Sequence, residues 1–225
     1  MHELIENLKQ KQWLWQANHT QSSGEYQSTG FDLLDQKLSG GFPLHGVVEI
    51  QSPMGIGELR LLMPHLRHNH TDRLTVFVQP PGHLCAEYLM AEGLNPDRVL
   101  LVNPKDEQQA LWVAEQCLKS GACSNVLLWH QALEVHQVRR LQVAGEQGNC
   151  LQFLFKSQQA HLFSLPVSLS MTLLPHEQGL EITITKRRGG WPHGKFVLNM
   201  KPYWPKLAIA PQSSVVVPFP VAQQG

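Results

Sequence analysis

The residue pattern with the clearest chemical meaning lies between positions 47 and 66. A β-branched run that suits a buried strand is followed by the turn Ser52-Pro53-Met54-Gly55-Ile56-Gly57, and apolar residues at helical spacing begin at Leu59. Strand, glycine turn and helix in this order favour phosphate binding, because the N–H groups of the turn and the helix dipole attract an anion. This stretch therefore predicts a loop with the shape of a phosphate site.

The side chains that would complete nucleotide chemistry are missing from this loop. The lysine of the phosphate-binding motif aligns with Glu58, the hydroxyl residue that would hold Mg²⁺ aligns with Leu59, and the first glycine aligns with Ser52. A carboxylate at a helix N-terminus suits the helix dipole but repels a triphosphate, by about 1–4 kcal/mol at ~4 Å. The glycines are expected to serve the turn, with weak anion binding by the backbone as the alternative. The expected degenerate phosphate loop comprises Ser52, Pro53, Gly55, Gly57, Glu58 and Leu59.

A second candidate site is a basic cluster late in the chain. Residues 180–206 hold six basic residues and one acid, Glu181, with aromatic residues between them. Basic and aromatic side chains together suit single-stranded DNA, through phosphate contacts and base stacking. The same pattern fits a protein-binding surface, or a solvated hairpin end with no partner. The candidate residues for DNA or partner binding are Lys186, Arg187, Arg188, Trp191, Lys195 and Trp204.

Composition limits the class of protein. The 225 residues include 18 Lys and Arg and 18 Asp and Glu, so any attraction to a polyanion must be local. No stretch has the pattern of a signal peptide or a membrane span, which predicts a cytoplasmic protein with no membrane partner. Three of the four cysteines, Cys85 among them, lie in apolar or helical patterns and are expected to be buried, reduced thiols.

The histidines and cysteines do not form a metal-binding pattern. The cysteines show no CxxC spacing. His65, His68 and His70 are spaced too loosely for a dependable metal site, so they are expected on a solvated helix face. We expect no catalytic residue, no metal and no cofactor in this chain.

The elements that must position the two candidate sites alternate along the chain. Apolar runs predict strands at 47–50, 74–78, 99–102, 126–129 and 151–155. Helical spacing predicts helices at 59–66, 84–92, 106–120 and 134–146, after a short capped helix that ends at a glycine pair. The alternating runs 169–174 and 180–186 predict a hairpin, and 196–200 one further strand. The expected fold is α/β, a mostly parallel sheet flanked by helices with a C-terminal β-hairpin extension.

Three parts are expected along the chain. Residues 1–27 form an amphipathic helix and a polar linker, residues 28–200 form the core, and residues 201–225 form a Pro-rich extended tail. The first and last parts hold large apolar residues with no evident cover, so they are expected to dock on partners. For the N-terminal helix, folding back onto its own core is an equal alternative.

The core resembles RecA, with a narrower resemblance to the ImuA family of RecA-like accessory proteins in bacterial translesion synthesis. The RecA resemblance covers about residues 28–200 and rests on TGFDLLD (29–35), Gly40-Gly41, Asn103-Pro104 and Ser120-Gly121-Ala122. The ImuA resemblance rests on MGIGELRLLMP (54–64), LKSGACSNVLLW (118–129), RRLQVAGEQG (139–148) and KRRGG (186–190). GIGELR and KRRGG together carry most of its specificity.

The resemblance implies a RecA-like core that has lost its ATPase groups. The RecA glutamate that polarises the attacking water aligns near Pro81, and the aspartate associated with Mg²⁺ aligns with Trp129, which is expected to fill the vacated space. Phosphoryl transfer depends on positioned charge, so the loss of these groups together with the loop lysine predicts a pseudo-ATPase.

The resemblance further implies a non-catalytic adaptor of SOS-induced translesion synthesis. Its implied partners are an ImuB-like Y-family protein and the alpha-subunit of an error-prone polymerase, with RecA and single-stranded DNA as further candidates. Its implied location is the bacterial cytoplasm, on the nucleoid when DNA is damaged. The alternative is a cell-division inhibitor like SulA, which shares a decayed RecA-type core and binds FtsZ.

Overall fold

The computed structural model describes residues 26–68, 72–157, 165–190 and 193–205. The expected N-terminal helix, His70, Trp191 and the tail beyond residue 205 lie outside the described residues.

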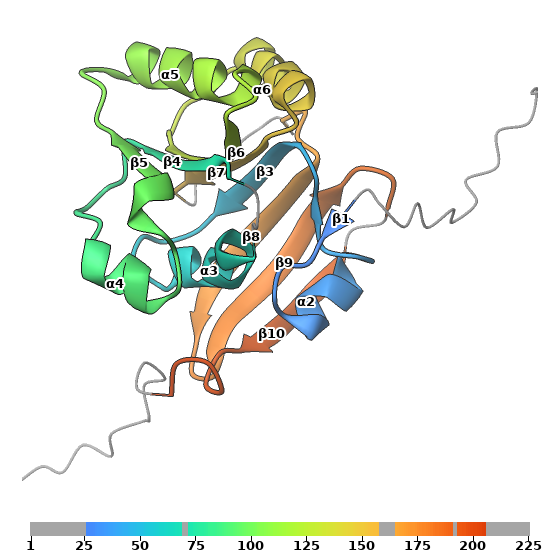
Figure 1. Cartoon of the computed structure of the whole chain (residues 1–225). Helices are drawn as coiled ribbons and strands as arrows, with labels where there is room; N and C mark the ends of the chain where they lie inside the picture. The colour runs from blue at the N-terminus through green and yellow to red at the C-terminus, as the bar shows by residue number, and fades with distance from the viewer. Residues whose placement is uncertain (1–25, 69–71, 158–164, 191–192, 206–225) are drawn as a thin grey trace, which may run out of the picture.

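The described residues form a mixed sheet of eight strands in the order β10-β9-β8-β3-β7-β6-β4-β5 (Figure 1). The strands from β8 to β5 in this order run parallel, whereas β9 and β10 add antiparallel pairs beyond β8. The parallel strands are β3 (Gly46–Gln51), β4 (Leu74–Val78), β5 (Val99–Val102), β6 (Cys123–Trp129), β7 (Leu151–Lys156) and β8 (Leu169–His176). The two strands of the antiparallel extension are β9 (Gly179–Arg187) and β10 (His193–Asn199). A separate short ribbon pairs β1 (Tyr26–Gln27) with β2 (Phe42–Pro43).

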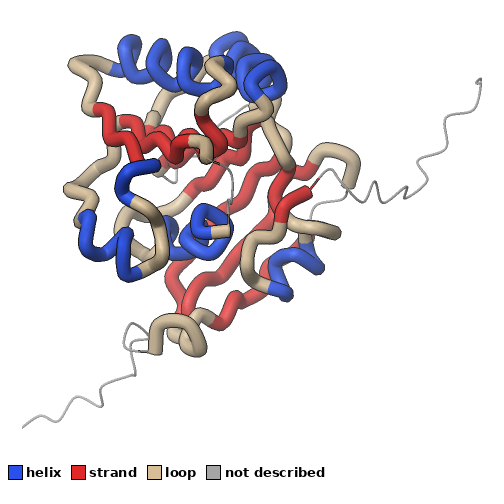
Figure 2. The backbone as a smooth tube through the Cα atoms, in the orientation of Figure 1, coloured by secondary structure: helices blue, strands red, loops and turns tan. Residues whose placement is uncertain are grey.

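Helices cover both faces of the sheet (Figures 1 and 2). On one face lie α5 (Glu107–Lys119) and α6 (Val135–Gly148). On the other face lie α3 (Glu58–Arg67) and α4 (Ala86–Ala91). The short helix α2 (Asp32–Lys37) lies beside β10. A 3₁₀ turn (Pro96–Arg98) precedes β5. The expected α/β fold, with a mostly parallel sheet and a C-terminal antiparallel extension, is confirmed.

Side chains that alternate along the strands build two separate cores. Val48, Ile50 and Phe153 face α3 and join a cluster that continues under β8, β9 and β10. Val47 and Leu154 face the opposite way, into a cluster with the apolar stripes of α5 and α6. Because both faces of the central strands are buried, these strands contain consecutive apolar residues, as is typical of parallel sheets.

The N-termini of α5 and α2 differ in how side chains cap them. The side chain of Asp106 accepts a hydrogen bond from the Gln109 N–H at 2.7 Å, which caps α5 at its expected start. In α2 the expected side-chain cap is not found. Phe31 is the N-cap residue, and Asp35 instead accepts a hydrogen bond from the Thr29 N–H at 2.8 Å.

The packing of the core continues beyond residue 200. The Tyr203 ring lies edge-on to Phe31, with ring centroids 4.9 Å apart. The indole N–H of Trp204 donates a hydrogen bond of 2.9 Å to the carboxylate of Glu92, the residue that follows α4. A truncation intended to remove the tail alone must therefore begin after residue 204.

Two sequence-based expectations about single residues are wrong. His65 does not lie on a solvated face: it is 3% exposed, between Phe42 and Phe153. Cys85 is exposed rather than buried, because it precedes the short helix α4 at the edge of the molecule. His68, one turn after His65, is exposed as expected.

The burial of His65 predicts a pH dependence of stability. Desolvation lowers the pKa of His65 below its usual range, against weaker opposing effects of hydrogen bonds to Ser28 O and to Asn125. Below about pH 6.5 the unfolded chain then binds more protons at this histidine than the folded protein does. The contribution of His65 to the free energy of unfolding is therefore fully present above that pH and is lost as the pH is lowered. We expect a loss of about 1 kcal/mol per pH unit below 6.5 in urea unfolding. A His65→Gln variant should show a shallower dependence, and an unchanged slope would contradict this role of His65.

Candidate functional site

The predicted phosphate loop connects β3 to α3 at the carboxyl end of the central strand. Gly55 and Gly57 have φ angles of +80° and +104°, which glycine adopts without strain. A Cβ at either position would meet no atom within 4 Å, so backbone angle rather than crowding requires glycine here. The loop therefore has the turn that the sequence predicted.

The carboxylate of Glu58 occupies the anion-binding groups of this loop. One carboxylate oxygen accepts a hydrogen bond of 3.0 Å from the Gly55 N–H, and the other accepts one of 3.1 Å from the Gly57 N–H. Glu58 is the first residue of α3 and is 8% exposed, so its charge also lies at the positive end of the helix dipole. The loop thus binds an anion that belongs to its own chain.

The remaining loop residues have structural contacts. The Ser52 N–H donates a hydrogen bond of 3.0 Å to the Lys156 carbonyl, which continues the pairing of β3 with β7. Leu59 packs against the apolar cluster beneath α3. Pro53 is half-buried in the turn.

A cavity of about 400 Å³ lies beside the loop and gathers the positions where RecA-like chemistry was expected. Pro81 and Trp129 both line it, together with Ser52 and Glu58. The Trp129 ring stacks on Phe155 at 4.6 Å and an interplanar angle of 8°, half-buried at the cavity wall. The structure therefore brings together the residues that the alignment placed at the nucleotide site.

These residues do not fit a nucleoside triphosphate with its Mg²⁺. The two loop N–H groups that would hold phosphate oxygens are bonded to Glu58. A second carboxylate, Glu107, lines the same cavity, and the positions aligned with the metal-associated groups are Leu59 and Trp129. A triphosphate entering here would meet the carboxylates of Glu58 and Glu107. Lys156 also lines the cavity, but it is 2% exposed and its ammonium is paired with Glu49.

A buried ion pair lies within the strands that carry the loop. The Lys156 ammonium lies 3.4 Å from the Glu49 carboxylate, and the two residues are 2% and 4% exposed. The Ser170 hydroxyl donates a hydrogen bond of 2.7 Å to the same carboxylate, and the Thr185 hydroxyl lies 2.9 Å from Ser170 Oγ. This polar group links β3, β7, β8 and β9, and sequence reasoning did not identify it.

The basic cluster lies at the opposite end of the sheet from the loop. Arg187 ends β9, where its guanidinium lies 5.7 Å from the ring centroid of Tyr26 and donates a hydrogen bond of 2.9 Å to the Ser39 hydroxyl. Arg188 donates a hydrogen bond of 3.2 Å to Glu146 on α6. Lys186 is turned toward the chain itself, because its ammonium donates to the Leu165 carbonyl.

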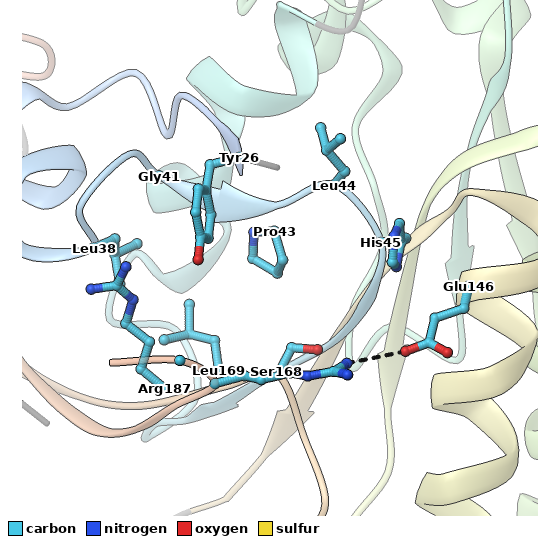
Figure 3. A pocket seen from close by; sticks show the side chains of 12 residues that line it. Tyr26, Leu38, Gly41, Pro43, Leu44, His45, Glu146, Ser168, Leu169 and Arg187 are labelled. Atoms are coloured by element: carbon cyan, nitrogen blue, oxygen red, sulfur yellow. Dashed lines mark hydrogen bonds and ion pairs between the residues drawn. The ribbon is translucent and has the colours of Figure 1, made fainter. Parts of the chain in front are cut away.

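Arg187 and Arg188 line a cavity of about 610 Å³ beside the β1–β2 ribbon (Figure 3). Leu38, Pro43 and Leu169 give it apolar walls. Arg188 and Glu146, which form an ion pair, also line it. His45 also lines the cavity, with a buried Nδ1 that has no hydrogen-bond partner within the described part of the chain. The arrangement combines guanidinium charge with apolar surface, which suits a partner that presents both an acidic group and an apolar side chain.

The other candidate binding residues do not join this cavity. Lys195 lies on β10 and pairs with Glu181 at 3.0 Å. Trp204 lies at the far end of β9 from Arg187, because it follows the end of β10, where Asn199 pairs with Gly179. The aromatic and basic residues of this segment therefore do not form one continuous surface.

Two structural features relate to other classes of function. Within the four described ranges, no group of three His, Cys, Asp or Glu residues could hold a metal ion. In the same ranges, no helix combines the length and the apolar character needed to cross a membrane.

Comparison with known proteins identifies relatives of two kinds. The chain is 32% identical over 100 residues to the cell division inhibitor SulA of Photorhabdus laumondii, covering 44% of this chain and 56% of SulA. It is 28% identical over 125 residues to RecA of Borrelia turicatae, covering 55% of this chain and 34% of RecA. The crystal structure of SulA from Pseudomonas aeruginosa superposes with a TM-score of 0.42 at 28% identity, over 49% of this chain and 98% of that chain. No protein-family model matches.

The chain is therefore homologous to SulA and to RecA. The matched regions span just over half of SulA and about a third of RecA. Homology agrees with the RecA-like character inferred from the sequence, and the narrower ImuA resemblance stays a prediction.

Proposed function

We propose that this chain is a non-catalytic adaptor of the bacterial SOS response that acts in translesion DNA synthesis. In this role it joins an ImuB-like Y-family protein to the alpha-subunit of an error-prone polymerase. The observation that carries the proposal is the Glu58 carboxylate bonded to the N–H groups of Gly55 and Gly57. A RecA-like core whose phosphate loop is filled by its own side chain suits binding to partners rather than ATP hydrolysis.

The motifs shared with ImuA support the translesion-synthesis part of the proposal. GIGELR contains Glu58 itself, and KRRGG contains Arg187 and Arg188, which line the larger cavity. We propose this cavity as the partner-binding surface. RecA is a further candidate partner, and single-stranded DNA is the competing ligand for the two arginines.

Charge reversal at Arg187 tests the surface. We expect Arg187→Glu to weaken binding to the ImuB-like protein of the same genome at least tenfold, which is about 1.4 kcal/mol. The matched control is Arg98→Glu, which makes the same charge change beside β5, at the opposite edge of the sheet. Calorimetry with both variants measures the effect.

Three outcomes decide this test. Equal losses in the two variants would contradict a specific surface at Arg187. No binding by the wild-type protein would contradict the adaptor role itself. Tighter binding of a fluorescent oligothymidine than of the ImuB-like protein, lost in Arg187→Glu, would assign the surface to DNA.

A second candidate function is inhibition of cell division. The match to SulA favours this function, because it is 32% identical and covers 56% of SulA, whereas the RecA match covers 34% of RecA. Co-sedimentation with FtsZ discriminates between the two. The adaptor proposal predicts that FtsZ polymers pellet in unchanged amount, whereas a SulA-like function predicts loss of the pellet at stoichiometric protein.

A further inference from the structure

The cavity beside the phosphate loop is lined by side chains with buried polar atoms that have no partner. Gln79 and His130 both line this cavity, which has a volume of about 400 Å³. Gln79 Oε1 and His130 Nδ1 are buried, and neither has a hydrogen-bond partner in the described part of the chain. Because buried polar atoms are rarely left without a partner, two of them at one cavity indicate that a ligand supplies the missing hydrogen bonds.

Backbone hydrogen bonds fix both residues at the ends of neighbouring strands. Gln79 follows β4, and its N–H donates a hydrogen bond of 2.9 Å to the Val102 carbonyl. Its φ angle of +55° lies in the left-handed region, a strain that is typical of binding sites. His130 follows β6, which pairs with β4, and its N–H donates a hydrogen bond of 3.1 Å to the Phe155 carbonyl. The two side chains are therefore positioned by the sheet itself.

Both unpartnered atoms are hydrogen-bond acceptors. The Gln79 atom is an amide oxygen, which only accepts. His130 is 5% exposed, and burial lowers the pKa of its ring against a weaker effect of Glu107, so the ring is neutral at pH 7. Its Nε2 lies 3.9 Å from a carboxylate oxygen of Glu107. A proton on Nε2 is attracted by this carboxylate, which leaves Nδ1 as the acceptor.

The charges that line the cavity favour a cation. Glu58 and Glu107 both contribute carboxylates, and the Glu107 side chain is 62% exposed, so a ligand can reach it. Lys156 also lines the cavity, but its charge is paired with that of the buried Glu49. The wall therefore carries net negative charge as well as unused acceptors.

We propose that this cavity binds a guanidinium group. The group is planar, positively charged and rich in N–H donors, so it can bond to the acceptors of Gln79 and His130 while its charge is compensated by Glu107. An ammonium is a compact, strongly hydrated charge and matches such separated acceptors less well. Trp129 and Pro81 add apolar surface to the cavity, which suits the alkyl chain that carries a guanidinium. The cavity thus binds a ligand opposite in charge to a nucleotide.

Calorimetry with the full chain tests this site with two guanidinium probes. Butylguanidinium presents the group on a small molecule, and a capped glycine pentapeptide with one central arginine presents it on a peptide. Butylurea and the same peptide with citrulline are neutral controls of matching shape. We expect a guanidinium probe to bind with a dissociation constant below about 1 mM, and its neutral control to bind about tenfold more weakly or worse.

Three variants locate the bound probe. Glu107→Gln removes a carboxylate and His130→Phe removes an acceptor, each with little change in side-chain size, so each should weaken binding by about fivefold or more. The matched control is Asp97→Asn, which also removes one negative charge. Asp97 is exposed and precedes β5, at the opposite end of the parallel strands from the cavity, so this variant should bind as the wild type does. Circular dichroism verifies that each variant is folded.

The outcomes separate support from contradiction. Binding of either guanidinium probe alone supports the proposal and identifies the source of the group, a small molecule or a peptide. Equal binding of the neutral controls would overturn the proposal, and so would no binding of either guanidinium probe. A loss in Asp97→Asn equal to that in Glu107→Gln would also overturn it. None of these results depends on the adaptor role, which is tested separately at Arg187.

Discussion

Replacing Lys156 by methionine is expected to lower the free energy of unfolding by about 3–5 kcal/mol. The substitution removes the ammonium that lies 3.4 Å from Glu49 and leaves a carboxylate buried at 4% exposure, with the Ser170 hydroxyl as its remaining hydrogen-bond donor. An uncompensated buried charge costs more than the pair contributes when intact. Urea unfolding at constant pH measures the loss.

The matched control is the double variant Glu49→Met, Lys156→Met. Removing both charges leaves no buried ion, so we expect the double variant to recover at least half of the loss. Part of the loss should persist, because the Ser170 hydroxyl then lacks its acceptor. A double variant no more stable than Lys156→Met would contradict the interpretation that the loss comes from an unpaired buried charge.

Replacing Glu58 by alanine is expected to have the second largest effect. The variant loses two hydrogen bonds from backbone N–H groups to a carboxylate that is 8% exposed. Such charge-assisted bonds contribute about 1.5–3 kcal/mol each and are not additive, so we expect a loss of about 2–4 kcal/mol in the free energy of unfolding.

The same variant should acquire a site for an external anion. With the Glu58 carboxylate removed, the N–H groups of Gly55 and Gly57 are free to bind sulfate or phosphate at the end of α3. Sulfate should therefore raise the melting temperature of the variant by more than it raises that of the wild type, where the general salting effect acts alone. Glu107→Ala is the matched control, because Glu107 lines the same cavity and is 62% exposed. Equal sulfate effects in all three proteins would contradict the account.

The sequence allowed much of the fold to be predicted, because strongly periodic segments carry their own signal. The ranges 74–78 and 99–102 match β4 and β5 residue for residue, and the α5 boundaries follow from Asp106 and Gly121. The predicted strand boundaries were wrong where polar residues begin a strand. β6 starts at Cys123, three residues before the predicted start, because Ser124 and Asn125 interrupt the apolar pattern.

The candidate sites were less predictable than the fold. The loop residues could be named from their order, but whether Glu58 turns back onto Gly55 and Gly57 depends on a side-chain conformation that spacing does not determine. A signal for the ion pair was present: Glu49 is a charged residue within an otherwise apolar buried strand, which requires a partner from another strand. Its identity as Lys156 depends on strand order, which periodicity does not give.

The larger cavity shows the same limit. Arg187 and Arg188 were identified from local charge, but Tyr26 and Glu146, which contact them, come from segments 161 and 42 residues away in the chain (187 − 26 and 188 − 146). The separation of Trp204 from this cluster also follows from topology, since the two lie at opposite ends of β9.

Calorimetric titration of the wild-type chain with ATP and ADP in the presence of Mg²⁺ tests whether Glu58 fills the phosphate loop. We expect no binding heat at millimolar nucleotide and no hydrolysis in parallel. Micromolar binding would contradict this expectation, because the N–H groups of Gly55 and Gly57 would then hold phosphate in preference to the Glu58 carboxylate, and the chain would be a nucleotide-dependent protein.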